Sequence, residues 1–377
     1  MAMLKGVNMT LMVGPVVPVP VGKDVLDALT DVEVVTSTDG PSVFRLNFEL
    51  STNSPLHTLF LISGQVSIPI IRVIIAVTLN GQTDVLIDGV MTNHQVQPGN
   101  NPSTSTMSVT GEDLTKVLDY LDLSGIAYPA MPPFARVNLM IAKYAFLGIV
   151  PKVIPSVLIN VPNPIDHIPR QDGKDLSYIK KLAEEVGYVF YHEPGPTPGI
   201  SFMYWGPEIK VGSPQPALNV DMDAHTNVDS ISFNFDSEQA TIPQVWIHNP
   251  ETKVPFPVPI PIINPLSPPL GFIPPITKNS QSLNHTAKYK PAQAIMMGLA
   301  AASKAAEAVT ANGSLDVLRY GRLLKARKLV GVRGVGHAFN GLYYVDKVTS
   351  KIQRGEFKQS FNLSRNGLLS TVSRVNA

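Results

Sequence analysis

The residues that could perform chemistry are few and scattered along this chain. In DMDAHT, Asp221, Asp223 and His225 alternate, and on one face of a strand they would form a conceivable metal site. A solvated polar strand face explains the same spacing, and no second cluster of ligands lies nearby in the sequence. We therefore expect no metal centre.

A glycine-rich segment, GVRGVGHAFNG (331–341), invites comparison with a dinucleotide-binding turn. Gly334 and Gly336 have the right spacing, but Phe339 occupies the third glycine position and the following YYVDKV has the composition of a strand. That fingerprint needs a strand, a glycine turn and then a helix. Turns or bulges are the better interpretation of these glycines.

The remaining candidates are isolated. Asp166 and His167 lie in a Pro/Asn-rich loop without a serine elbow, Glu184 and Glu185 belong on the exposed side of a helix, and Trp205 suits a buried strand end better than a ligand platform. With no cysteine in the chain, disulfides, thiolate metal sites and cysteine nucleophiles are excluded. We expect no catalytic residue and no cofactor.

Composition indicates a globular chain with an uneven charge. The chain of 377 residues is long enough for two or three domains, and its 44% of apolar residues can fill their cores. From 312 to 377 there are 12 Lys/Arg and 3 Asp/Glu, so a net +9 lies there and −8 in the rest. Prolines 15, 18 and 20 interrupt the apolar start, and no apolar stretch is long enough for a bilayer, so we expect neither a signal peptide nor a membrane span.

The elements that would position any site form three blocks. Residues 1–111 have β patterning: apolar and polar residues alternate through VFRLNFEL (43–50), and a hairpin with a turn at Gly81-Gln82 follows. We expect a tube-like β-barrel domain, possibly completed by strands near 217–236.

Residues 112–215 have the pattern of a small α+β domain. Three helices are predicted: one capped by TGED from Thr110, one over 135–148, and one over 172–187 with Leu176, Ile179, Leu182 and Val186 on its buried stripe. Gly148 and Gly187 are suited to end the last two helices.

Residues 216–377 return to β patterning, and we expect a second tube-like β-barrel domain. An alanine-rich helix is predicted near 291–310, opened by Pro291 and closed by Asn312-Gly313. The fold class is therefore mainly β with α+β, in which two β-barrel domains flank the small α+β domain.

A proline-rich tract interrupts the last block. Nine of the 23 residues from 254 to 276 are proline and nearly all the others are apolar. Proline lacks an N–H and fixes φ, so a helix or an interior strand is excluded. We expect an extended arm that leaves the β domain and packs against another chain, in preference to a solvated linker. Its candidate contact residues are the large apolar ones: Phe256, Ile260, Ile262, Ile263, Leu266 and Phe272.

Several strings in this order resemble one family. VTGEDLTKVLD, RQDGKDLSYIKKLAEEVGYVFY and GVGHAFNGLYYVDKVTSKIQRGEFKQSFNLSRNG are similar to the baseplate central hub proteins of contractile phage tails and contractile injection systems, the late-control-D type, and to the N-terminal half of VgrG spikes. The resemblance covers essentially the whole chain, but the 254–276 tract is not part of the pattern.

The resemblance implies a structural protein and not an enzyme. Family hubs are homotrimers in the tail baseplate, assembled in the host cytoplasm, and they adapt the sixfold tail tube to the threefold spike. The implied partners are the spike trimer, the tail tube hexamer, the tape measure protein and the baseplate wedge proteins, with DNA or cargo passing through the lumen.

Two other functions remain open at this stage. A tail-associated cell-wall-degrading enzyme would need an acid/base carboxylate in a cleft or a metal cluster. A nucleic-acid-binding protein would use the basic C-terminal segment, 312–377, and its binding would depend steeply on salt.

Overall fold

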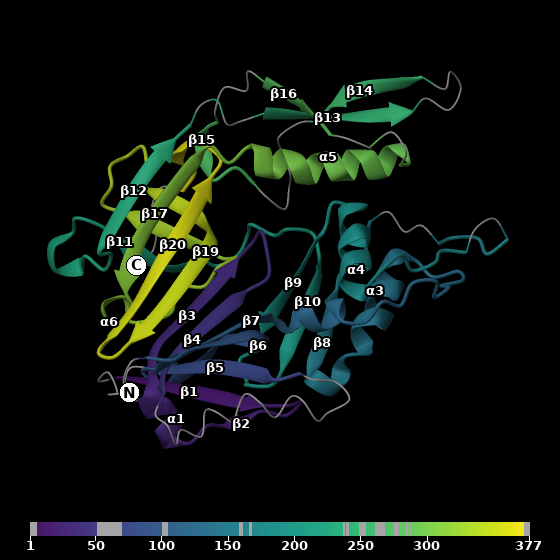
Figure 1. Ribbon diagram of the computed structural model, residues 1–377. Coiled ribbons are helices and arrows are strands. Elements are labelled where there is room, and N and C mark those ends of the chain that lie inside the picture. The colour runs from purple at the N-terminus through teal and green to yellow at the C-terminus, as the bar shows by residue number, and fades with distance from the viewer. Residues whose placement is uncertain are drawn as a thin grey trace.

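The computed structural model shows a mainly β chain with a smaller α+β part (Figure 1). In the described part of the chain, no helix has the length and apolarity needed to cross a membrane. The structure describes residues 6–50, 70–99, 105–157, 161–165, 168–236, 238, 241–248, 254–260, 268–274, 279–283, 286 and 289–372.

Two β regions carry most of the strands. The first region contains β1 (Val7–Gly14), β2 (Val19–Pro20), β3 (Leu29–Ser37), β4 (Val43–Leu50), β5 (Arg72–Leu79), β6 (Gln82–Gln97) and β7 (Ser105–Asp113), with the short helix α1 (Lys23–Ala28). The second region contains β11 (Gln215–Asn219), β12 (Ser230–Phe235), β17 (Val309–Asp316), β18 (Leu329–Arg333), β19 (Gly341–Gln353) and β20 (Glu356–Arg365), with α6 (Val317–Tyr320).

One continuous sheet runs through both regions. Its order is β12-β17-β20-β19-β3-β4-β7-β6-β5-β1-β2, and the two regions meet where β3 pairs antiparallel with β19. In the part of the chain that the structure describes, the strand pairings link the regions and none closes either region on itself. β11 and β12 pair with β18 and β17, so the strands near 217–236 do not complete the first region.

A shared hydrophobic core lies behind this sheet. Phe44, Leu46 and Phe48 from β4 pack in the same buried cluster as Phe357 and Phe361 from β20. The alternation seen in 43–50 is confirmed, since the even-numbered residues from Phe44 to Leu50 are buried. The hairpin of β5 and β6 is also confirmed, although its turn is Asn80-Gly81, where both residues have positive φ.

The α+β domain packs around a second core. It contains a 3₁₀ helix (Leu114–Asp119), α3 (Pro133–Ala142), a 3₁₀ turn (Ala145–Leu147), β8 (Ile149–Val153), α4 (Asp175–Glu184), β9 (Val189–Pro194) and β10 (Ser201–Gly206). Ile179, Leu182 and Val186 are buried as predicted and Leu176 is partly buried against them. Gly187 follows α4 with a φ of 68°, as predicted. The helix predicted over 135–148 is too long, because α3 ends at Ala142 and Gly148, with a φ of 71°, follows the separate 3₁₀ turn.

The first predicted helix is wrong in its start and its type. Thr110 and Gly111 belong to β7, where a Cβ on Gly111 would lie 2.4 Å from the Phe44 ring, so the strand needs glycine there. Asp113 is the cap instead, because its side chain accepts a hydrogen bond from the Thr115 N–H. Only a 3₁₀ helix follows, and it ends at Asp119.

A third layer is built from the chain between β12 and β17. It contains β13 (Thr241–His248), β14 (Pro255–Pro259), β16 (Asn279–Ser282) and α5 (Pro291–Ala305), and Figure 1 shows α5 lying along this small sheet. Pro291 opens α5 as predicted, but Asn312 and Gly313 do not close it. They lie in β17, because this segment pairs with β12 and β20.

Candidate functional site

The sequence motifs with chemical potential do not form a reaction centre in the described residues. Asp221 and Asp223 have φ of 48° and 49°, and Asp223–His225 is a 3₁₀ turn, so the expected alternation on one strand face is wrong. No group of three or more His, Asp and Glu in the described chain could hold a metal ion. Asp166 and His167 lie outside the described residues, and Glu184 is exposed.

Two other motifs have structural roles. Trp205 is fully buried in the core of the α+β domain and meets Tyr188 edge to face, with ring centroids 4.9 Å apart. Gly334 and Gly336 form the turn between β18 and β19 with φ of 87° and 85°, and a strand follows them, not a helix. Neither motif offers a ligand site.

The proline tract forms a strand at the edge of the third layer. β14 pairs antiparallel with β13, and the Ile260 N–H donates to the Pro243 carbonyl at 3.0 Å. In an antiparallel strand only every second residue directs its N–H and C=O at the partner. Prolines 255, 257 and 259 alternate with the residues that do so.

The predicted exclusion of an interior strand is confirmed for Pro255–Pro259, because β14 lies at the edge of its sheet. A proline at every second residue removes N–H groups from the outer edge alone, and it leaves the inner edge free to pair with β13. The outer edge then presents carbonyl groups without donors, so no further strand can be added there with a normal ladder.

The six candidate contact residues of the tract fall into three groups. Ile260 is 3% exposed and packs with Val245 beneath α5, so its side chain serves the chain's own core. Phe256 is 44% exposed and Phe272, on β15 (Gly271–Ile273, paired with β21, Leu368–Ser370), is 75% exposed. Ile262, Ile263 and Leu266 lie outside the described residues.

The continuous sheet has one face of polar and charged side chains. Register places Ser232, Asn312, Asn362, Lys347 and Ser37 in one row across five strands. A second row consists of Lys358, Lys351, Glu33, Arg45 and Thr110. The opposite face supplies the shared core. The sheet therefore extends through both β regions with one polar face and one face packed on the core.

Part of the basic surplus in residues 312–377 is structural. Arg365 is buried, donates to the carbonyls of Ala338 and Asn340, and lies over the Tyr343 ring at 4.5 Å. Lys325 and Arg319 form ion pairs with acidic residues outside this segment, Asp84 and Asp229. Fewer charges are therefore free for a polyanion than the sequence count suggests.

A buried ion pair joins the α+β domain to the first β region. The Arg72 guanidinium binds both carboxylate oxygens of Asp88 at 2.7 and 2.6 Å, and both side chains are almost fully buried. Arg72 also donates to the Gly199 carbonyl, and the Ser201 hydroxyl donates to Asp88 at 2.7 Å. Both of these partners belong to the β9–β10 hairpin, whose position on the β region is thereby fixed.

Arg327 connects all three parts of the chain. Its guanidinium donates to the Ser37 carbonyl at the end of β3 and lies 4.2 Å from the centroid of Tyr191 in β9, while its backbone N–H donates to Val345 in β19. Burial lowers the pKa of Arg327 from its ordinary value, but an arginine this basic stays charged at neutral pH. The contacts hold β9 against both β regions.

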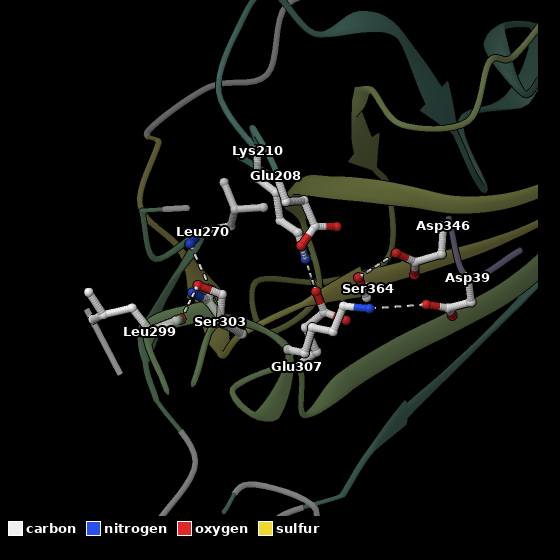
Figure 2. Close-up of polar contacts among 11 residues, drawn as sticks. Asp39, Glu208, Lys210, Leu270, Leu299, Ser303, Glu307, Asp346 and Ser364 are labelled. Atoms are coloured by element: carbon white, nitrogen blue, oxygen red, sulfur yellow. Dashed lines mark hydrogen bonds and ion pairs between the residues drawn. The ribbon is translucent and has the colours of Figure 1, made fainter. Parts of the chain in front are cut away.

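The Arg72–Asp88 pair and Arg327 each form a joint, by which we mean a polar contact between different parts of the chain. A third joint is a mixed-charge cluster at the C-terminal end of α5 (Figure 2). Lys210, from the segment after β10, is buried and forms a hydrogen bond to Glu307 beyond α5, with Glu208 3.7 Å away. Asp346 of β19 accepts a hydrogen bond from Ser364 at 3.0 Å. These residues line a polar cavity of about 520 Å³ between α5 and the polar sheet face.

Charges in this cluster change the proton affinity of its members. Burial, together with the nearby Glu307, raises the pKa of Asp346 to about 7. Burial also raises the pKa of Glu307, although Lys210 opposes this effect. Burial lowers the pKa of Lys210, but the attraction of Glu307 and Glu208 outweighs it, so its pKa lies above the ordinary value. At neutral pH the Asp346 carboxyl is therefore partly protonated, while Lys210 stays charged.

The fold is that of tail proteins of known structure. A tail protein from Neisseria meningitidis MC58 superposes with a TM-score of 0.62 at 11% identity, covering 97% of this chain and 98% of that one. The prophage MuSo2 43 kDa tail protein from Shewanella oneidensis gives 0.57 at 14% identity, covering 95% and 98%. No family model matches this chain, and no curated protein matches it in sequence.

A chain of the lidded Francisella PdpA–VgrG complex has the same fold as part of its length. Its TM-score is 0.61 at 8% identity, and the match covers all of this chain and 55% of that chain. Identities this low show a shared fold alone.

Proposed function

We propose that this chain is the central hub of the baseplate of a contractile tail or injection particle and that it acts as a homotrimer. The observation that carries the proposal is the single sheet that runs through both β regions and has one polar face. Three copies would bring six β regions around one axis, and six similar regions suit a sixfold tube on one side and a threefold spike on the other. The tail-protein fold supports this role.

The three joints support a structural role over a catalytic one. A protein that adapts one symmetry to another must hold its parts in fixed orientations. The Arg72–Asp88 pair, Arg327 and the Lys210 cluster each connect different parts of the chain through buried charges. A turbidity assay on peptidoglycan with purified protein is expected to show no clearing, and robust clearing would contradict a purely structural role.

The exposed part of the proline tract, on β14 and β15 with Phe256 and Phe272, is the proline edge. It is the surface that we propose for contact with a neighbouring chain of the trimer or with the spike. Phe256 on β14 and Phe272 on β15 are large apolar side chains that the chain leaves exposed, and aromatic residues are enriched at protein interfaces. Since β14 presents no N–H at its outer edge, the contact would be made by side chains and carbonyl groups and not by an added strand.

Light scattering after size-exclusion chromatography tests the assembly. The protein is expected to be a trimer, alone or with the spike protein, and a stable monomer in the presence of the spike would contradict the hub. The proline edge is tested separately with Phe256→Ser and Phe272→Ser together. These changes are expected to weaken the trimer or its spike complex, whereas Val17→Ser, at an equally exposed site on the first β region, is expected to have no effect.

A further inference from the structure

His192 is a buried histidine without a hydrogen-bond partner. It lies in β9, is 1% exposed, and in the described part of the chain neither ring nitrogen has a partner. Buried polar groups in native proteins are nearly always paired, so an unpaired one needs a reason. Histidine is also the side chain whose charge changes between pH 5 and 8.

Four charged side chains, two of each sign, act electrostatically on this ring. Asp88 of β6 and Asp113 of β7 favour a charged imidazole, whereas Arg72 of β5 and Arg327, which precedes β18, oppose it. Burial has a larger effect than any of them and lowers the pKa of His192. The neutral ring is therefore the form that fits the folded chain.

Both nearby carboxylates already have donors. Asp88 accepts from Arg72 with both oxygens and from the Ser201 hydroxyl. Asp113 accepts from the Ser42 N–H at 2.6 Å with one oxygen, and from the N–H and the hydroxyl of Thr115 with the other. A protonated His192 would need an acceptor for each of its two N–H groups, and in the closed joint neither ring nitrogen has a hydrogen-bond partner among the described residues.

The ring lies at the joint between the α+β domain and the first β region. β9 packs against β6, and its hairpin partner β10 carries the Ser201 contact to Asp88. We propose that His192 makes this joint acid-sensitive: protonation of the ring separates the β9–β10 hairpin from β5, β6 and β7, while the cores of the two parts stay folded.

The direction of the pH effect follows from the different proton affinity of His192 in the open and closed joint. In the open joint the ring is hydrated and titrates near its ordinary pKa of about 6.5. In the closed joint its pKa is lower. Closure is therefore fully favoured above about pH 6.5 and weakens as the pH falls, by up to about tenfold in the opening equilibrium per pH unit. Between pH 7.5 and 5.0 the open fraction is expected to rise, by at most about 30-fold.

The absence of cysteine from the chain allows a direct test. Ser201→Cys places a single thiol at a fully buried position of the joint. Its labelling rate is measured at pH 7.5 and 5.0 and divided at each pH by the rate of the same protein in urea, which removes the titration of the thiol itself. We expect the ratio to rise in acid by more than about twofold and at most about 30-fold for Ser201→Cys alone, and by less than about twofold when His192→Leu or His192→Phe is added.

His94→Leu is the matched control, because His94 lies on β6 and is exposed. It is expected to leave the acid response unchanged. Two results would overturn the proposal: a labelling ratio that does not change with pH in the Ser201→Cys protein, or an acid response that persists at full size in both His192 variants. A simultaneous loss of far-ultraviolet circular dichroism would also overturn it, since the acid change would then be global unfolding.

Discussion

Replacing Arg327 by methionine tests whether one side chain holds the three parts of the chain together. Methionine keeps the apolar stem but removes the charged hydrogen bond to Ser37 and the contact with Tyr191. A hydrogen bond to a charged group contributes about 1.5–3 kcal/mol and a desolvated cation–π contact about 2 kcal/mol. Against this, the Arg327 Nε is buried without a partner, which costs about 1–3 kcal/mol. The net loss of stability is expected to be about 0.5–4 kcal/mol, with a central value of roughly 2 kcal/mol.

Urea denaturation followed by tryptophan fluorescence measures this loss. In a Trp246→Phe background the signal comes from Trp205, which is buried in the α+β domain and reports on that domain. Lys328→Met is the control, since the neighbouring Lys328 is exposed and its replacement is expected to change stability by less than about 0.5 kcal/mol. If Arg327→Met and Lys328→Met unfold at the same urea concentration, the three-part role assigned to Arg327 is wrong.

Three further predictions concern the other parts of the chain. Leu182→Ala is expected to destabilise the α+β domain by about 2–5 kcal/mol, because Leu182 is buried in its core, and an unchanged melting temperature would contradict this. Asp346→Asn is expected to flatten the pH dependence of the melting temperature. Since the folded pKa of about 7 exceeds the unfolded value, the wild-type carboxyl adds stability at low pH that is lost as the pH rises towards and through 7, and Asp39→Asn, an exposed carboxyl of the same cavity, should not abolish that loss. Gly298→Val should loosen α5 from β13 and β14, because a Cβ there would lie 2.5 Å from Ile260 Cγ1; faster hydrogen exchange in α5 would show it, and unchanged exchange would refute it.

Local elements of this fold can be predicted from the sequence, whereas its long-range pairings cannot. The strand over 43–50 and the helix with Ile179, Leu182 and Val186 follow from periodicity, because burial on one face leaves a repeat in the sequence. The pairing of β3 with β19 leaves no such repeat, since it joins strands at opposite ends of the chain.

The joints were missed for a related reason. Arg327 is one of 12 basic residues in 312–377, which were interpreted only through the net charge of that segment. Nothing in the neighbouring sequence indicates that Arg327 is partly buried. His192 did have a signal, because it continues the strand face of Tyr188 and Phe190, and a histidine on an apolar face is a candidate for burial. The proline tract shows the opposite error: its composition excluded an interior strand correctly, but an edge strand needs only alternate N–H groups.

The pairing of β3 with β19 has a consequence for biosynthesis. β3 leaves the ribosome roughly 300 residues before its partner, which corresponds to about 15–60 s at the usual 5–20 residues per second. During that interval one edge of β3 has no native partner, and unpaired edges are where nascent chains aggregate. The sheet is completed only when the last fifth of the protein has been made. A chain that terminates before Gly341 would therefore keep that edge exposed for its whole lifetime, and a nonsense mutation late in the coding sequence should yield insoluble protein instead of a shorter working subunit.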